Sequence, residues 1–370
     1  METNKKVLTA PFMATHPTAI IKDEIKARGM SQKELAERME MKTSNLSRLL
    51  KGENITSAIA AKLESALDIP ATMWLNLQAQ YDKDIKAIAL RDKQETAAIN
   101  TERMLSTMLN LPELYKRLDI SASSFIQTKL QILKDVLGFQ PLEIGTQRFA
   151  TQFCYKKSDK HNTDEKNQNT WLTLAYIKSK ESKPLVPYTE DAAREAALEI
   201  SKEVHTGALS EAAIKDILHQ HGIAYTVVEK LEKTPIDAVA INMDDYPAIV
   251  TTHRYNDMSR LVFNVLHELG HIAQHMNGTD TIFISSDETY STEDSKEKEA
   301  NKFAEDMLIA PSIWKKMMSS ETNGISSRNI INKLKSLSKE NHLDFNVVVW
   351  RYKYESHTYN LYGAKPVMIR

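Results

Sequence analysis

Hydrophobic and polar positions alternate with the period of an α-helix over most of the chain. Short amphipathic segments follow one another from about residue 17 to 81. Helical patterns also fill 120–205, 210–222 and the region from about 256 to the C-terminus, with exposed loops predicted at 156–170 and 277–292. These patterns predict a mainly α-helical protein.

Three short runs rich in β-branched residues interrupt the helical period. They lie at 224–231, 237–243 and 247–253, separated by turn residues, which is typical of strands in one small sheet. The predicted fold class is therefore mainly α with a small α+β part. We expect a domain at 1–82, a helical middle region at 83–200 and a C-terminal domain at 201–370. The segment 82–116 is either a dimer seam or a linker packed on its own chain.

Composition excludes several classes of protein. Among 370 residues there are only 10 glycines and 11 prolines, which agrees with a helical chain. The single cysteine, Cys154, excludes an intrachain disulfide framework and a cysteine-based metal site. The N-terminus lacks a hydrophobic leader and no run of about 18 apolar residues occurs, so we expect a cytoplasmic protein without a membrane segment. Because the net charge is −1, any DNA-binding surface must be local.

The N-terminal domain contains the pattern of a helix-turn-helix at residues 31–56. Ser31 and Glu34 form a capping box that predicts a helix beginning directly after Ser31. After a short break, Thr43 is expected to cap a second helix over 44–51. Two short helices joined by a tight turn are the geometry that a helix-turn-helix needs. The positions predicted to face the core are Leu35, Ala36, Met39, Leu46, Leu49 and Leu50.

Residues 14–82 resemble the five-helix XRE-type DNA-binding domain, in the variant found in HigA antitoxins. SQKELAERM (31–39), SRLLKG (47–52) and WLNLQAQYD (74–82) carry the likeness. It implies that the helix at 44–51 enters the major groove of a double-stranded DNA operator, with the protein binding as a homodimer. The alternative is a helical module that binds only protein partners. The base-reading candidates are Ser44, Asn45, Ser47 and Arg48, and the phosphate-binding candidates are Lys42, Thr43 and Lys51.

The C-terminal domain carries an H-E-x-x-H motif within NVLHELGHIAQH (264–275). Residues four apart share one face of a helix, so His267 and His271 can direct ring nitrogens at one ion. Glu268 lies beside them, within reach of a water molecule on that ion. The pattern predicts zinc, with a third protein ligand and an open fourth position.

The third ligand is expected on the helix predicted within 291–311. Glu297 and Asn301 are four residues apart and share a helix face. We therefore assign Glu297 as the ligand and Asn301 as a brace for a metal-bound histidine. Glu299 is the rival ligand, but it points about 200° away from Glu297 on the same helix and is expected to be solvated.

His275 extends the stripe of His267 and His271 by one more helical turn. A histidine at that position lies about 6 Å too far along a straight helix to share the site. We expect His275 to pack or form a hydrogen bond at the end of the helix instead of binding the ion.

Residues 234–314 resemble the ImmA/IrrE metallopeptidase domain, which has a zincin-like fold and is often fused or adjacent to an XRE regulator. HELGH (267–271) and EKEANKFA (297–304), preceded by a few strands, carry the likeness. It implies a zinc-dependent endopeptidase with Glu268 as general base, acting on a repressor-like protein. The residue that stabilises the oxyanion stays open among Arg254, Tyr255, Tyr290 and His275.

Two functions compete on this basis. The first is a DNA-binding regulator that carries a zinc endopeptidase and cleaves a repressor or a toxin–antitoxin component. The second is an antitoxin-like transcriptional repressor whose metal domain is a non-catalytic sensor or docking surface. A weaker third option is a toxin-neutralising protein that binds its partner through the helical middle region.

Overall fold

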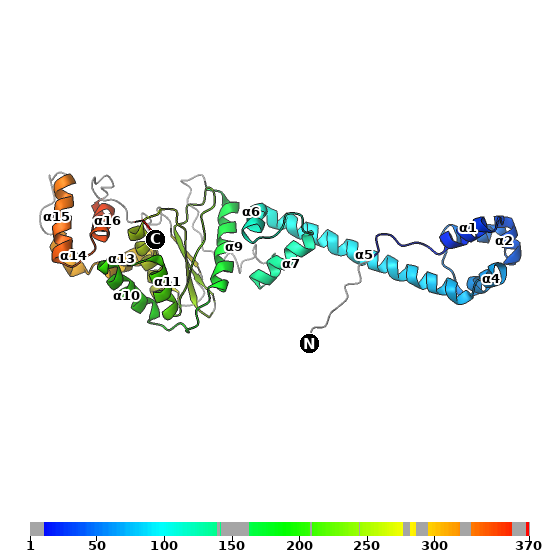
Figure 1. Cartoon of the computed structure of the whole chain (residues 1–370), viewed down its shortest axis with the longest axis horizontal. Helices are drawn as coiled ribbons and strands as arrows, with labels where there is room; N and C mark the ends of the chain where they lie inside the picture. The colour runs from blue at the N-terminus through cyan, green and yellow to red at the C-terminus, as the bar shows by residue number, and fades with distance from the viewer. Residues whose placement is uncertain are drawn as a thin grey trace. The chain divides into compact units, whose positions relative to one another are not determined.

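The computed structural model in Figure 1 describes residues 11–138, 141, 163–207, 209–243, 245–276, 282–285, 295–318, 327–356 and 368–369. It is mainly helical with one small sheet, which confirms the predicted fold class. The chain divides into two compact units, Met1–Asn100 and Thr101–Arg370. No helix among the described residues is both long and apolar enough to cross a membrane.

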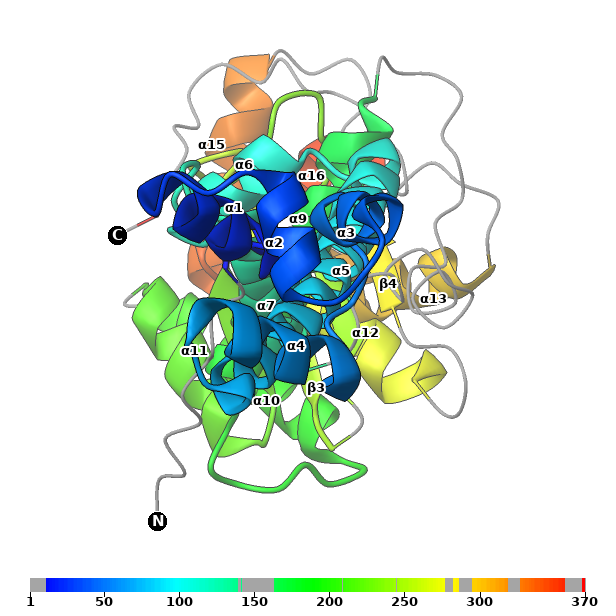
Figure 2. The same ribbon diagram turned by 90° about the vertical axis from the view of Figure 1, so that its right-hand side faces the viewer.

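In the N-terminal unit, four short helices and the start of a fifth, long helix surround one apolar core, drawn in blue in Figure 2. The inward-facing positions predicted from the sequence are all buried in this core, and Trp74 completes it. The helices are α1 (Thr18–Ala27), α2 (Gln32–Arg38), α3 (Thr43–Leu50), α4 (Ser57–Leu67) and α5 (Ala71–Met108).

Side-chain capping sets where α2 begins, as predicted. The Glu34 backbone N–H donates a hydrogen bond to Ser31 Oγ over 3.1 Å. The prediction for α3 is wrong in one respect, because Thr43 is the first residue of the helix and Lys42 is its N-cap. Lys42 has no oxygen in its side chain, so α3 begins without a side-chain capping bond.

α5 continues without a break through residue 82, where the predicted domain boundary falls. It ends at Met108, and α6 (Leu111–Arg117) follows after two residues. The part of α5 beyond Asn100 belongs to the second unit, where Leu105 is fully buried.

The second unit is built on a four-stranded sheet with the order β1-β3-β2-β4. β1 (Ala224–Val227) runs parallel to β3 (Pro247–Thr251), whereas β3 and β4 (Ile282–Ser285) are both antiparallel to β2 (Ala238–Asn242). The three predicted strands are confirmed. The loop predicted at 277–292 is wrong for residues 282–285, which form β4. Its apolar run is too short to be distinguished from a loop by pattern alone.

Helices cover both faces of this sheet (Figure 1). Alternating side chains send Val239 and Ile241 into the core formed with α6, α7 (Ile126–Leu137) and α9 (Glu165–Glu181), and Ala240 into the core on the opposite side. The helices of the opposite side are α10 (Ala192–Thr206), α11 (Glu211–Gln220), α12 (Met258–His275), α13 (Ser295–Leu308), α14 (Pro311–Met318), α15 (Ser327–Glu340) and α16 (Phe345–Ser356).

The loop predicted at 156–170 is wrong for its last residues, which form the start of α9. The helix begins at Glu165, while residues 156–162 lie outside the described part of the chain. Polar residues near its start are buried because other segments satisfy them. Asn167, for example, donates a hydrogen bond to the carbonyl of Glu232 over 2.9 Å. A polar pattern predicts exposure only when such partners are absent.

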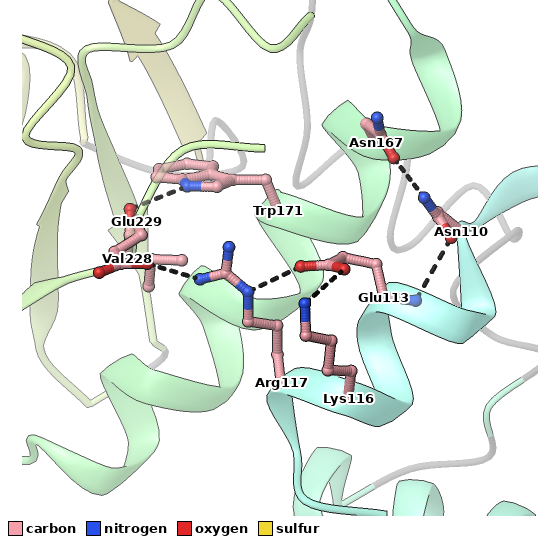
Figure 3. Close-up of polar contacts among 8 residues, drawn as sticks. All are labelled: Asn110, Glu113, Lys116, Arg117, Asn167, Trp171, Val228 and Glu229. Carbon is pink, nitrogen blue, oxygen red and sulfur yellow. Dashed lines mark hydrogen bonds and ion pairs between the residues drawn. The ribbon is translucent and has the colours of Figure 1, made fainter. Parts of the chain in front are cut away.

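Two further contacts join α6, α9 and the segment after β1 (Figure 3). Trp171 is fully buried, and its indole N–H donates a hydrogen bond to the carbonyl of Val228 over 3.1 Å. Asn110, the N-cap of α6, donates to Asn167 over 2.7 Å. The described part of the middle region that follows Asn100 therefore belongs to the same unit as the sheet, whereas residues 83–100 belong to the N-terminal unit.

Candidate functional site

α12 carries the H-E-x-x-H motif through the interior of the second unit. The helix begins where the Ser259 backbone N–H donates a hydrogen bond to Asp257 Oδ1 over 3.0 Å. Its apolar side lies in the core between the sheet and the neighbouring helices. As a result, the side chains of His267, Glu268 and His271 are fully buried.

The glycine of the motif lets α13 approach α12 closely. A Cβ atom at Gly270 would lie 3.1 Å from Ala300 Cα and 3.2 Å from Phe303 Cβ, closer than ordinary contacts allow. Because no side chain separates the two helices here, short-range contacts form between them. Glu297 and Asn301 of α13 are thereby brought against the histidines of α12.

The predicted ligands converge on one point. The Nε2 atoms of His267 and His271 are 3.0 Å apart, and each lies 3.3 Å from a carboxylate oxygen of Glu297. Two ligand atoms about 2.05 Å from a shared zinc ion, at a tetrahedral angle, are about 3.4 Å apart. His267 Nε2 approaches Oε2 of the carboxylate and His271 Nε2 approaches Oε1, so the three side chains converge at distances close to those between two ligands of one zinc ion.

A hydrogen bond orients the first histidine for this role. His267 Nδ1 lies 2.8 Å from Asn301 Oδ1, and an amide oxygen can only accept a hydrogen bond. His267 Nδ1 is therefore the donor in this bond, and Nε2 is the ring nitrogen that lies next to the other predicted ligands. Asn301 thus makes the contact predicted for a brace.

Burial and local hydrogen bonds set the charge of the cluster. Burial lowers the pKa of His271 to about 4, so this imidazole is neutral at pH 7. Burial by itself would raise the pKa of Glu297, but its contacts with His267 and His271 outweigh this effect and lower that pKa to about 2. Two imidazoles and one carboxylate are the donor set that a divalent zinc ion accepts.

His275 and Glu299, the two rejected ligands, pair with each other. His275 Nε2 lies 3.1 Å from Glu299 Oε2, and His275 Nδ1 lies 3.1 Å from Nδ1 of His271. His275 makes hydrogen bonds at the end of α12, as predicted. Glu299 is exposed as predicted, but its long side chain also contacts His275, which helical angles alone did not indicate.

The candidates for oxyanion stabilisation fall in different places. Arg254 lies 3.5 Å from the buried carboxylate of Asp237, and its guanidinium stacks on the ring of Tyr255 at 5.0 Å. These residues line a small pocket together with Asn264, which is one turn before His267 on α12. Tyr290 lies outside the described residues.

α3 presents a polar outer surface opposite its apolar core side. The predicted DNA-contacting residues are exposed, except that Ser47 is only partly exposed. Arg48 forms an ion pair of 3.0 Å with Glu53, just beyond the helix. Helical periodicity did not indicate Glu53, because it assigns faces only to residues within the helix. The exposed residues are Lys42, Thr43, Ser44, Asn45, Arg48 and Lys51.

Comparison with known proteins identifies the N-terminal unit. Residues 21–74 match the helix-turn-helix family model, from α1 to the start of α5. A search among curated proteins found no match to the chain. The two short helices α2 and α3, with their buried apolar faces and tight connection, have the geometry of that family. Residues 21–74 are therefore an XRE-family helix-turn-helix domain, the DNA-binding part of a transcriptional regulator.

Proposed function

We propose that the chain is a DNA-binding regulator whose second unit is a zinc-dependent endopeptidase. One observation carries the peptidase proposal: the ligand atoms of His267, His271 and Glu297 converge at separations of 3.0 to 3.3 Å inside a buried helix pair. The proposed substrate is a repressor-like or antitoxin-like protein, because the motifs of the two units resemble ImmA/IrrE peptidases and HigA antitoxins. A cytoplasmic homodimer on a DNA operator completes the proposal.

The residues divide the chemistry in a simple way. Zinc, when bound, would polarise a peptide carbonyl and acidify an attacking water molecule. Glu268 follows His267 directly on α12, and its carboxylate can accept the proton of that water and pass it to the leaving amine. Asn301 holds the ring of His267 in the tautomer that a ligand needs.

Zinc content tests the first half of this proposal. Protein purified without chelators is expected to contain about one zinc ion per chain, and His267→Ala is expected to lose it. His253→Ala is the matched control, because His253 is a partly exposed histidine of the same unit that pairs with Glu211 over 2.7 Å. Equal zinc content in all three proteins would contradict the assignment.

Cleavage tests the second half. The full-length protein with zinc is incubated with the protein encoded by the neighbouring gene, and fragments are measured by mass spectrometry. Glu268→Gln is expected to keep zinc and to lose cleavage, because the amide cannot accept the proton. Cleavage by Glu268→Gln at the parental rate would show that Glu268 is not the general base.

Complete burial of the motif favours a second candidate function. His267, Glu268 and His271 have no exposed surface. A closed site of this kind suits a non-catalytic zinc centre that senses metal or stabilises the unit within a transcriptional repressor. In that case the parental protein binds zinc and His267→Ala does not. The parental protein then cuts no substrate, and its binding to the operator depends on zinc.

The outer surface of α3 is proposed to read the operator. Arg48→Ala is expected to weaken binding to a selected operator about 5- to 150-fold, since a side chain that contacts a base contributes about 1 to 3 kcal/mol. Arg28→Ala is the matched control, because Arg28 pairs with Glu24 at the end of α1. Gel-shift titration at fixed salt measures both, and equal losses would mean that only overall charge matters.

A further inference from the structure

A chain of three side chains leads from the ligand cluster to the protein surface. His271 Nδ1 lies 3.1 Å from His275 Nδ1, and His275 Nε2 lies 3.1 Å from Glu299 Oε2. The side chain of His275 is 6% exposed, whereas that of Glu299 is 60% exposed. The middle member is therefore held inside the protein between a candidate ligand and a solvated carboxylate.

The chemistry of the terminal carboxylate determines where the protons lie. An ionised glutamate only accepts hydrogen bonds, so Nε2 of His275 must be the donor to Glu299. With that proton on Nε2, a lone pair on Nδ1 of His275 can accept the N–H of His271 Nδ1. His271 in turn has its lone pair on Nε2, the atom that lies 3.0 Å from Nε2 of His267.

The two histidine ligands are thus oriented by different means. His267 donates to a single amide oxygen, that of the buried Asn301. His271 donates to a second imidazole, which is itself oriented by a carboxylate. Both outer partners, Asn301 and Glu299, come from α13, so the helix that supplies the third ligand also orients the first two.

We propose that His275 and Glu299 are positioning residues that hold His271 in the tautomer and ring orientation required for zinc. The proposal rests on the zinc centre described under the proposed function. A carboxylate that orients a ligand histidine raises the basicity of that ligand, and loss of such outer partners weakens metal affinity about 10- to 100-fold. Here the carboxylate acts through an intervening imidazole.

Zinc affinity of the full-length protein, measured by competition with a chromophoric chelator, tests this arrangement. His275→Ala is expected to weaken zinc binding about 10- to 100-fold, and Glu299→Ala by a smaller factor. Glu299→Gln keeps an oxygen that can accept from His275, so it is expected to recover most of the parental affinity. Gln274→Ala is the control, because Gln274 is exposed on α12 next to His275.

A spectroscopic measurement separates positioning from general stability. Cobalt(II) replaces zinc, and its visible absorption reports the geometry and basicity of the ligands. His275→Ala and Glu299→Ala are expected to shift this spectrum, while the thermal unfolding of the metal-free proteins stays close to that of the parent.

The outcomes are distinguishable. If His275→Ala and Glu299→Ala bind zinc like the parent while His267→Ala loses it, the positioning role is wrong and the zinc centre stands. If Glu299→Gln loses as much affinity as Glu299→Ala, the hydrogen-bond acceptor is not what matters and the role is also wrong. If His267→Ala has no effect either, the zinc centre itself is refuted.

Discussion

Replacing Gly270 by alanine tests whether the close approach of α12 and α13 assembles the proposed metal centre. The added methyl carbon would lie 3.1 Å from Ala300 Cα, 3.2 Å from Ala300 O and 3.2 Å from Phe303 Cβ. Ordinary contacts begin at 3.4 Å, so α13 must move by a few tenths of an ångström. Two of the three atoms are backbone atoms, which cannot rotate away as a flexible side chain can.

Two opposing terms set the change in stability. Alanine in a helix interior is about 1 kcal/mol more favourable than glycine. Inserting a methyl group into a packed interior costs about 1 to 3 kcal/mol. We therefore expect the free energy of unfolding to fall by about 0 to 2 kcal/mol.

Zinc affinity is the more sensitive quantity. Metal–ligand distances tolerate a deviation of only about 0.2 Å, which is less than the displacement expected for Glu297. We expect zinc binding by Gly270→Ala to weaken about tenfold, equivalent to about 1.4 kcal/mol. Chelator competition measures the affinity, and Gln274→Ala controls for a change on the exposed face of the same helix.

The result that would refute this reasoning is specific. If Gly270→Ala binds zinc as tightly as the parent and unfolds with a free energy about 1 kcal/mol higher, only helix propensity has acted. The close approach at Gly270 would then not limit where Glu297 lies.

Three further predictions concern other parts of the chain. Trp171→Phe should lower the free energy of unfolding by about 2 to 3 kcal/mol in urea titrations, because the buried carbonyl of Val228 loses its donor and a cavity forms; a loss below 0.5 kcal/mol would argue against that bond. Ser31→Ala should destabilise the N-terminal unit by about 1 kcal/mol, and unchanged amide exchange in α2 would contradict it. Glu53→Gln should tighten DNA binding severalfold in gel shifts, because the carboxylate of Glu53 no longer competes with DNA for Arg48. Weaker binding would show that Glu53 orients Arg48 instead.

Local patterns predicted the features that depend on one segment. The start of α2 follows from Ser31 and Glu34, whose capping bond spans three residues. The pairing of His267 with His271 follows from the helical repeat, since residues four apart share a face whatever surrounds them. The predicted strands β1, β2 and β3 follow from β-branched runs bounded by turns.

Features that join distant segments could not be predicted with the same certainty. The polar residues at the start of α9 read as a loop, but Asn167 is buried because the carbonyl of Glu232 accepts its hydrogen bond. β4 was missed because four residues forming an edge strand differ little from a loop in sequence. In both cases the stabilising partner lies far away along the chain.

The sequence by itself determined one functional element in each unit. In the first unit this is an amphipathic helix with polar side chains on its exposed face, and in the second it is a pair of histidines with an adjacent glutamate on one helix. Only the tertiary structure decided how these groups are completed. The approach at Gly270 brings Glu297 to 3.3 Å from both histidines, and it also places Glu299 against His275. The physical reason is that periodicity defines which side chains share a face of one helix, whereas packing between helices defines which faces meet.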